Sequence, residues 1–144
     1  MSPSLLDVNV LIALVFEDHV AHRTVKRWFQ TAGAKPWVTC PLTEAGFVRV
    51  VSNPRFSQPP LYIDEALEML NRVTQLPGHR LWPMEIGFHE AVRPFAERIF
   101  GHQQVSDAYL LGLAIKKSGK LVTLDRAIEA LAGREFRNAV VFLE

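Results

Sequence analysis

The chain has 144 residues, of which 49% are hydrophobic and 22% charged, and its formal net charge is +1. This balance predicts a single globular domain over residues 1–144 and argues against a disordered chain or a strongly basic coat for nucleic acids. The lone cysteine, Cys40, excludes an intramolecular disulfide, and we read neither a secretory leader nor an apolar run of the roughly 20 residues that span a bilayer, so we expect a cytoplasmic protein without a membrane partner.

The hydrophobic pattern predicts strands that alternate with helices along the whole chain. An opening strand runs directly into an apolar helix, and a helix with one polar face then leads to the second strand. Pro41 ends that second strand, and Pro94 interrupts or offsets a later helix. The predicted strands cover residues 4–7, 35–40, 80–82, 120–124 and 139–143. The predicted helices cover residues 8–15, 19–31, 43–51, 63–76, 88–100, 106–118 and 126–131.

Strands that alternate with helices are typical of parallel β-α-β units. The sequence therefore predicts an α/β fold of three layers, in which helices cover both faces of a central parallel sheet.

Four acidic residues interrupt segments that otherwise look buried. Asp7 and Asp125 each follow an apolar strand, whereas Glu44 and Asp107 lie on helices with apolar residues three, four and seven positions further on. Taken singly, each acid has a simpler explanation. Asp7 and Asp125 suit helix caps, and Glu44 and Asp107 suit the first turn of a helix, where a negative charge is favourable.

As a set, the four acids predict a cation site. Residues at the carboxyl ends of parallel strands, and in the helices that follow, meet at one edge of a sheet. Carboxylates a few ångströms apart raise one another's pKa and cannot all ionise without a counterion. Ligand oxygens without cysteine or a well-spaced histidine pair favour Mg²⁺ or Mn²⁺ over zinc.

The four acids lie in short motifs that follow one another along the chain. The motifs are Asp7-Val8-Asn9, Pro41-Leu42-Thr43-Glu44, Val105-Ser106-Asp107-Ala108-Tyr109-Leu110 and Thr123-Leu124-Asp125. In order and spacing, this set resembles the PIN-domain ribonucleases, and in particular the VapC toxins of bacterial toxin–antitoxin operons, over essentially the whole chain. The resemblance implies a PIN fold with a parallel sheet of about five strands.

The resemblance also implies an activity and partners. The expected activity is cleavage of RNA by an endoribonuclease that depends on Mg²⁺ or Mn²⁺, and the expected partners are a second copy of the chain and a VapB-type antitoxin. By the same resemblance, the catalytic and metal-binding residues are Asp7, Glu44, Asp107 and Asp125, with Asn9 and Thr123 in support. Asp7, Glu44 and Asp107 are expected to hold one ion, with Asp125 completing that site or a second one.

Three further residues are candidates for RNA contact. Arg49 and Arg55 flank the loop after the helix that carries Glu44, where they could reach a phosphate near the metal. His102 precedes Asp107 in a loop and could touch substrate, although a loop histidine beside Gly101 is more often merely solvated.

Other functions remain open at this point. A phosphatase of the haloacid dehalogenase type also has an aspartate after its first strand, but it normally needs a second aspartate where this chain has Asn9. A phospho-acceptor receiver domain needs paired acids at that strand's end, and none is present. The non-enzymatic alternative is a PIN-like scaffold that binds RNA or protein without cutting.

Overall fold

Five parallel strands form one sheet in the order β3-β2-β1-β4-β5. The computed structural model describes residues 2–144. The strands are β1 (Ser4–Leu6), β2 (Trp37–Thr39), β3 (His79–Leu81), β4 (Lys120–Thr123) and β5 (Val140–Phe142). The predicted α/β fold with a five-stranded parallel sheet is therefore confirmed.

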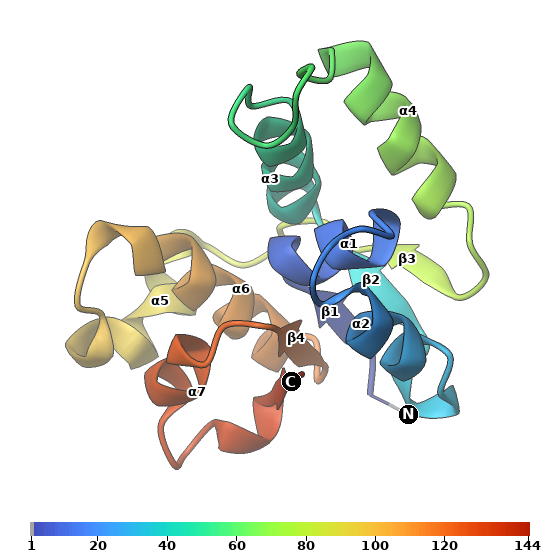
Figure 1. The fold of residues 1–144 in the computed structure, drawn as a ribbon. Coiled ribbons are helices and arrows are strands. Elements are labelled where there is room, and N and C mark those ends of the chain that lie inside the picture. The colour runs from blue at the N-terminus through green and yellow to red at the C-terminus, as the bar shows by residue number, and fades with distance from the viewer. Residues whose placement is uncertain (1) are drawn as a thin grey trace.

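Helices cover both faces of this sheet (Figure 1). One face carries α1 (Val8–Val15), α2 (His22–Phe29), α3 (Pro41–Val51) and α4 (Ile63–Val73). The other carries α5 (Phe88–Val92), α6 (Val105–Lys116) and α7 (Ala127–Ala132). Short 3₁₀ turns lie at Ala32–Ala34, Arg93–Arg98, His102–Gln104 and Arg137–Ala139.

The central strands divide the interior into two hydrophobic cores. Leu5 and Leu121 pack with α5, α6 and α7, whereas Leu6 and Val122 pack with the helices of the opposite face. All four side chains are fully buried. Successive side chains on a strand point to opposite faces, so a strand buried on both sides needs an unbroken apolar run. This explains why β1 and β4 lack the alternation of a half-exposed strand.

Among the helix boundaries that differ from the sequence prediction, three have a clear local reason. Pro41 begins α3 instead of only ending the strand before it, because its missing N–H has no partner to lose in a first turn. The helix predicted over 88–100 ends at Val92 and continues as a 3₁₀ turn that contains Pro94. The helix predicted from His19 begins at His22, because the His19 ring instead accepts a hydrogen bond from the N–H of Ala21.

The strand order reverses at β1. The chain passes from β1 to β2 and β3 on one side, whereas β4 and β5 lie on the other. In open α/β sheets, the crevice at the carboxyl ends of the strands flanking such a reversal is the usual place for a ligand. Here those strands are β1 and β4, which Asp7 and Asp125 follow.

The helices between residues 2 and 144 are all too short or too polar to cross a membrane.

Close packing of α5 on α6 gives a test of the fold. A methyl group added to Gly112 in α6 would collide with the backbone carbonyl of Ala91 in α5. We expect Gly112→Ala to lower the free energy of unfolding by about 1–3 kcal/mol, because backbone cannot yield as a flexible side chain does. Urea unfolding measures the change. Gly101→Ala is the control, since a methyl group there meets nothing within 4 Å. Equal stability of the two variants would contradict this packing.

Candidate active site

A cleft of about 450 Å³ lies between α1, α3 and the first turns of α6, beside the ends of β1 and β4. The polar side chains in its lining are Asp7, Asn9, Arg49, Gln103, Ser106, Asp107 and Asp125. The apolar part of the lining is Val8, Ile12, Leu42, Ala45, Gly46, Val50 and Leu110. Three of the four predicted acids thus meet at one cleft although they lie far apart in the sequence.

Asp7 is the most buried of these acids, with only 6% of its surface exposed. Its Oδ1 accepts a hydrogen bond from the N–H of Val8 at 2.8 Å, and its Oδ2 accepts one from the Thr123 hydroxyl at 2.8 Å. Burial raises the pKa of Asp7, and these two hydrogen bonds oppose that rise. Asp7 is also the N-cap residue of α1, so capping and a place in the cleft coincide.

Thr123 and Asn9 connect the ends of β1 and β4. The Thr123 hydroxyl donates to Asp7 and accepts a hydrogen bond from the N–H of Asp125 at 3.0 Å. Asn9 Oδ1 accepts a hydrogen bond from the N–H of Leu124 at 3.3 Å. These contacts fit the supporting role predicted for both residues, since they fix the backbone that carries Asp7 and Asp125.

Asp107 and Asp125 complete the acidic side of the cleft. Asp107 lies in the first turn of α6, and its carboxylate forms no hydrogen bond within residues 2–144. Burial, with smaller contributions from the charges of Asp7 and Asp125, raises the pKa of Asp107 to about 7. Asp125 accepts a hydrogen bond from the N–H of Ala127 at 2.9 Å, so it too stabilises the start of a helix. The cleft lining therefore contains three acidic side chains, and Arg49 is the basic side chain among the lining residues.

Glu44 lies apart from the other three acids. Its Oε2 accepts a hydrogen bond from the Thr39 hydroxyl at 2.6 Å, and its side chain is not part of the cleft lining. The reason is the rotation of α3: one side of the helix carries Ala45 and Arg49 to the cleft, whereas Glu44 lies on the side that faces the end of β2. The sequence analysis expected all four acids at one place, and the structure brings three of them together.

The chemistry of the cleft fits a hard divalent cation. Asp7, Asp107 and Asp125 offer carboxylate oxygens, and the pKa of Asp107 is raised first by burial and then by the charges of the other two acids, which a cation would neutralise. Within residues 2–144, no group of three or more histidine, cysteine, aspartate or glutamate side chains is arranged so that it could hold a metal ion.

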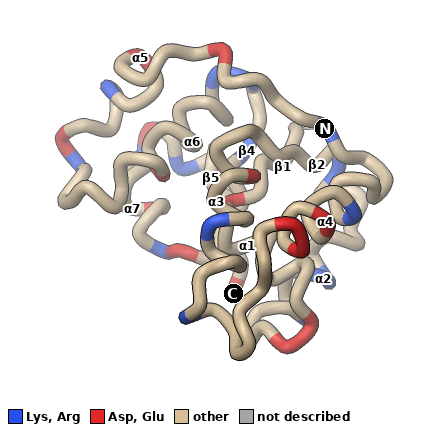
Figure 2. The backbone as a smooth tube through the Cα atoms, turned by 90° about the horizontal axis from the view of Figure 1, so that it is seen from above, with Lys and Arg blue, Asp and Glu red and all other residues tan. Residues whose placement is uncertain are grey.

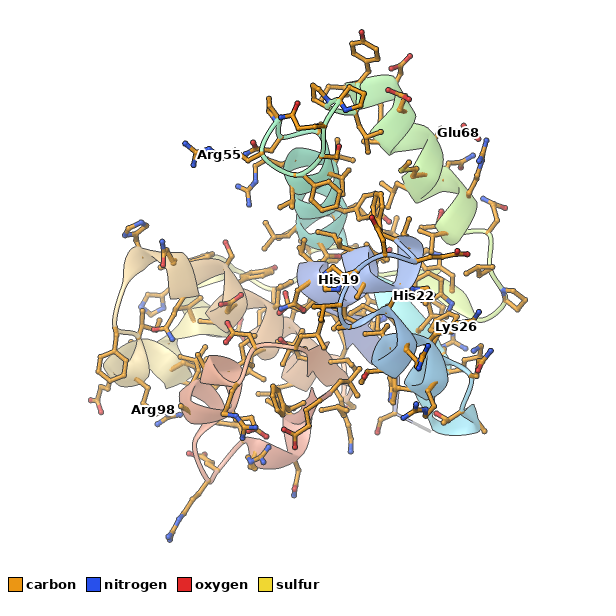
Figure 3. All side chains as sticks on the ribbon, in the orientation of Figure 1. His19, His22, Lys26, Arg55, Glu68 and Arg98 are labelled. Carbon is orange, nitrogen blue, oxygen red and sulfur yellow. The ribbon has the colours of Figure 1, made fainter. Side chains whose placement is uncertain are left out.

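The structure separates the three residues predicted to contact RNA. Arg49 lines the cleft and is exposed. Arg55 extends outward from the loop after α3 (Figure 3), and His102 is exposed in the 3₁₀ turn before α6 and does not line the cleft.

Gln103 and Ser106 line the cleft where the sequence analysis had favoured their neighbour His102. The positions of these residues in the sequence could have indicated that they lie near Asp107. Gln103 lies four residues before Asp107, which places it near that acid wherever the turn and helix continue, whereas Ser106 directly precedes Asp107 in the chain. They were missed because neither side chain titrates.

Charges elsewhere are mixed. Figure 2 shows acidic and basic residues interspersed along the backbone, in keeping with the net charge of +1.

Known proteins resemble the chain in sequence. The PIN-domain family model matches residues 4–134. Ribonuclease VapC38 of Mycobacterium tuberculosis is 37% identical over 140 residues, which cover 97% of each chain. Ribonuclease VapC44 of the same organism is 37% identical over 129 residues, which cover 90% of each chain.

Solved structures share the fold. A VapC20 structure from Mycobacterium tuberculosis, described as a sarcin-ricin loop cleaving toxin, gives a TM-score of 0.65 at 16% identity and covers 90% of this chain and 95% of its own. VapBC2 from Rickettsia felis, bound to a DNA fragment from its promoter, gives 0.66 at 11% identity over 99% of both chains. At such identities the likeness concerns the fold alone.

The sheet order, the acidic cleft and the family match together define a PIN domain. With identities of 37% over nine-tenths or more of both chains, the protein belongs to the VapC-type ribonucleases of the PIN-domain family. The resemblance drawn from the four motifs is confirmed.

The raised pKa of Asp107 predicts how stability depends on pH in the absence of divalent cations. The folded state holds the Asp107 proton up to about pH 7, against an ordinary value of 3.8. The resulting stabilisation is complete below that ordinary value and is lost as the pH rises through about 7. Asp107→Asn carries no charge, so it should be more stable than the parent at about pH 8 and lose this advantage toward about pH 5.

Thermal unfolding in EDTA across this pH range measures the effect. The control is Asp64→Asn, which makes the same chemical change at an exposed acid on α4. Parallel pH profiles for Asp107→Asn and the parent would show that the charge of Asp107 is not destabilising.

Proposed function

We propose that the protein is an endoribonuclease that depends on Mg²⁺ or Mn²⁺ and acts as the toxin of a toxin–antitoxin pair. The observation that carries this proposal is the meeting of Asp7, Asp107 and Asp125 at one cleft, in a chain that is 37% identical to VapC ribonucleases over nearly its whole length. A cleft with three carboxylates would repel RNA phosphates, so a cation is needed for the substrate to approach at all.

Each residue of the cleft has a part in this proposal. Asp107, whose carboxylate is free of hydrogen bonds, is the acid that can turn most easily toward an ion. Asp7 keeps a fixed orientation through Thr123 and the N–H of Val8, and Asp125 has one carboxylate oxygen left after its hydrogen bond to Ala127. A rigid ligand and a mobile one together suit a site that closes around a cation.

Asp7, Asp107 and Asp125 would hold a divalent ion, which would supply an activated water and a positive charge beside the phosphoryl oxygens. The chain itself supplies orientation. Arg49, on the α3 side of the cleft, is placed to hold a phosphate of the RNA, and the amide of Gln103 and hydroxyl of Ser106 offer further hydrogen bonds from the α6 side. With this division of tasks, no histidine or lysine base is required.

Glu44 remains a proposed fourth ligand. It would have to leave Thr39 to reach the cleft, since its carboxylate accepts a hydrogen bond from Thr39 at the end of β2. We propose that Asp7, Asp107 and Asp125 form the initial site and that Glu44 joins them, or contacts a second ion, after binding.

The proposed partners are a VapB-type antitoxin and a second copy of the chain. Membership of the VapC ribonucleases supports the antitoxin. Among the solved relatives of this fold is a toxin–antitoxin complex from Klebsiella pneumoniae, which at 16% identity bears on the fold only. The cytoplasm is the proposed compartment.

The proposed activity predicts a loss of RNA cleavage when the acidic cleft is altered. Purified protein should cut RNA in Mg²⁺ or Mn²⁺ and stop in excess EDTA. Asp7→Asn and Asp107→Asn should each reduce the cleavage rate by about 100-fold or more, because each removes a carboxylate that would hold the cation. Asp64→Asn, outside the cleft, should cut like the parent. Cleavage that persists in EDTA or in both cleft variants would refute the mechanism, and binding without any cleavage by the parent would support a scaffold.

The position of Arg49 predicts its effect on RNA affinity. Arg49→Ala should weaken RNA binding and reduce the slope of log affinity against log salt by about one, the change expected for one lost phosphate contact. Fluorescence anisotropy with a labelled RNA, measured with Ca²⁺ and the Asp107→Asn background to prevent cleavage, gives both quantities. Arg134→Ala, an exposed arginine after α7, is the matched control. An unchanged slope for Arg49→Ala would remove this residue from the RNA site.

A further inference from the structure

A chain of two hydrogen bonds leads from β3 through β2 to Glu44. His79 Nε2 lies 2.7 Å from the Thr39 hydroxyl, and that hydroxyl donates to Glu44 Oε2 at 2.6 Å. Thr39 is the last residue of β2 and is fully buried, and His79 is the first residue of the neighbouring β3. None of these three residues is part of the lining of the acidic cleft.

The direction of the two hydrogen bonds follows from counting protons. A threonine hydroxyl has one proton, and an ionised carboxylate can only accept. The Thr39 proton therefore goes to Glu44, and His79 must carry a proton on Nε2 and donate it to Thr39. Both donors thus point toward the Glu44 carboxylate, and the second hydrogen bond strengthens the first.

The His79 ring is itself held in place. It packs against the ring of Trp37, with the two centroids 4.6 Å apart. Trp37 is fully buried, and its indole N–H donates to the carbonyl of Pro77 at 3.1 Å. Thr39 and His79 therefore form a rigid pair, whereas Glu44 is half-buried and has three rotatable side-chain bonds.

Glu44 is within reach of the cleft through its own helix. Its neighbours Leu42 and Ala45 both line the cleft, and we take a change of side-chain rotamer to be what would redirect the carboxylate. In the cation-free cleft, a fourth negative charge would be repelled by Asp7, Asp107 and Asp125. With a cation present the same charge would be attracted.

We propose that Thr39 and His79 are positioning residues that hold the Glu44 carboxylate at the end of β2, so that Glu44 must leave Thr39 before it can bind a cation in the cleft. This inference rests on the proposed function, because it takes the acidic cleft to be the cation site. The consequence is that cation binding must break the Thr39–Glu44 hydrogen bond. Removing the Thr39 hydroxyl should therefore strengthen cation binding, whereas a residue that merely shaped the site would weaken it on removal.

The test measures Mn²⁺ affinity by isothermal titration calorimetry on the full chain, without RNA. Thr39→Val keeps the shape of the buried side chain and removes the hydroxyl. It should bind Mn²⁺ about tenfold more tightly than the parent, as expected when a hydrogen bond to a charged group no longer has to be broken. Thr39→Ser keeps the hydroxyl and should bind like the parent.

A second pair of variants links the effect to Glu44. Glu44→Gln removes the carboxylate that accepts the Thr39 hydrogen bond. Adding Thr39→Val to this variant should therefore leave Mn²⁺ affinity unchanged. His79→Phe retains an aromatic ring against Trp37 and removes the second donor, and it should tighten Mn²⁺ binding by less than Thr39→Val does. This variant also serves if Thr39→Val does not fold, which circular dichroism in EDTA determines.

The outcomes separate the inference from the proposed function. Mn²⁺ affinity that is unchanged or weaker in both Thr39→Val and His79→Phe overturns the positioning role, as does an equal gain in the Glu44→Gln background. Asp107→Asn is the reference: if it binds Mn²⁺ like the parent, the acidic cleft is not the cation site and the proposed function fails. If Asp107→Asn loses Mn²⁺ while the Thr39 and His79 variants match the parent, only the positioning role fails.

Discussion

The hydrogen bond between Thr123 and Asp7 joins two strands whose residues lie 116 positions apart, and the geometry of the cleft depends on it. Parallel pairing of β1 with β4 brings Leu6 opposite Val122, so that the residues after both strands emerge at the same level. The Thr123 hydroxyl then reaches Asp7 and the N–H of Asp125 together. A buried carboxylate without such partners would be strongly unfavourable, so the sheet and the acidic cleft stabilise each other.

Helix capping and a place in the cleft are compatible roles for the same acids. Asp7 and Asp125 accept hydrogen bonds from backbone N–H groups at the start of helical segments, and both line the cleft. The N–H groups orient one oxygen and leave the second one directed elsewhere. Capping thus fixes the acid at little conformational cost, which is what a ligand for a cation requires.

Burial and repulsion between acids determine how the cleft ionises. Burial and the neighbouring acids raise the pKa of Asp107 to about 7, whereas Glu44 is held at the end of β2 by Thr39. The α3 helix therefore presents a positive Arg49 and the small Ala45 and Gly46 to the cleft, and keeps its acid on another side. Gly46 lets α3 approach α1 closely, because a methyl group there would collide with the side chain of Val8.

The sequence by itself determined the parallel α/β fold, because unbroken apolar strands that alternate with helices have few other solutions. It also singled out the four acids Asp7, Glu44, Asp107 and Asp125, since an acid in an apolar segment needs a cause, and it matched the four motifs to the PIN domain. Only the tertiary structure decided where Glu44 points and that Gln103 and Ser106, not His102, line the cleft. Side-chain direction depends on the rotation of a packed helix and on hydrogen bonds between distant residues, such as those of Thr39 with Glu44 and His79. Neither can be read from the spacing of residues along the chain.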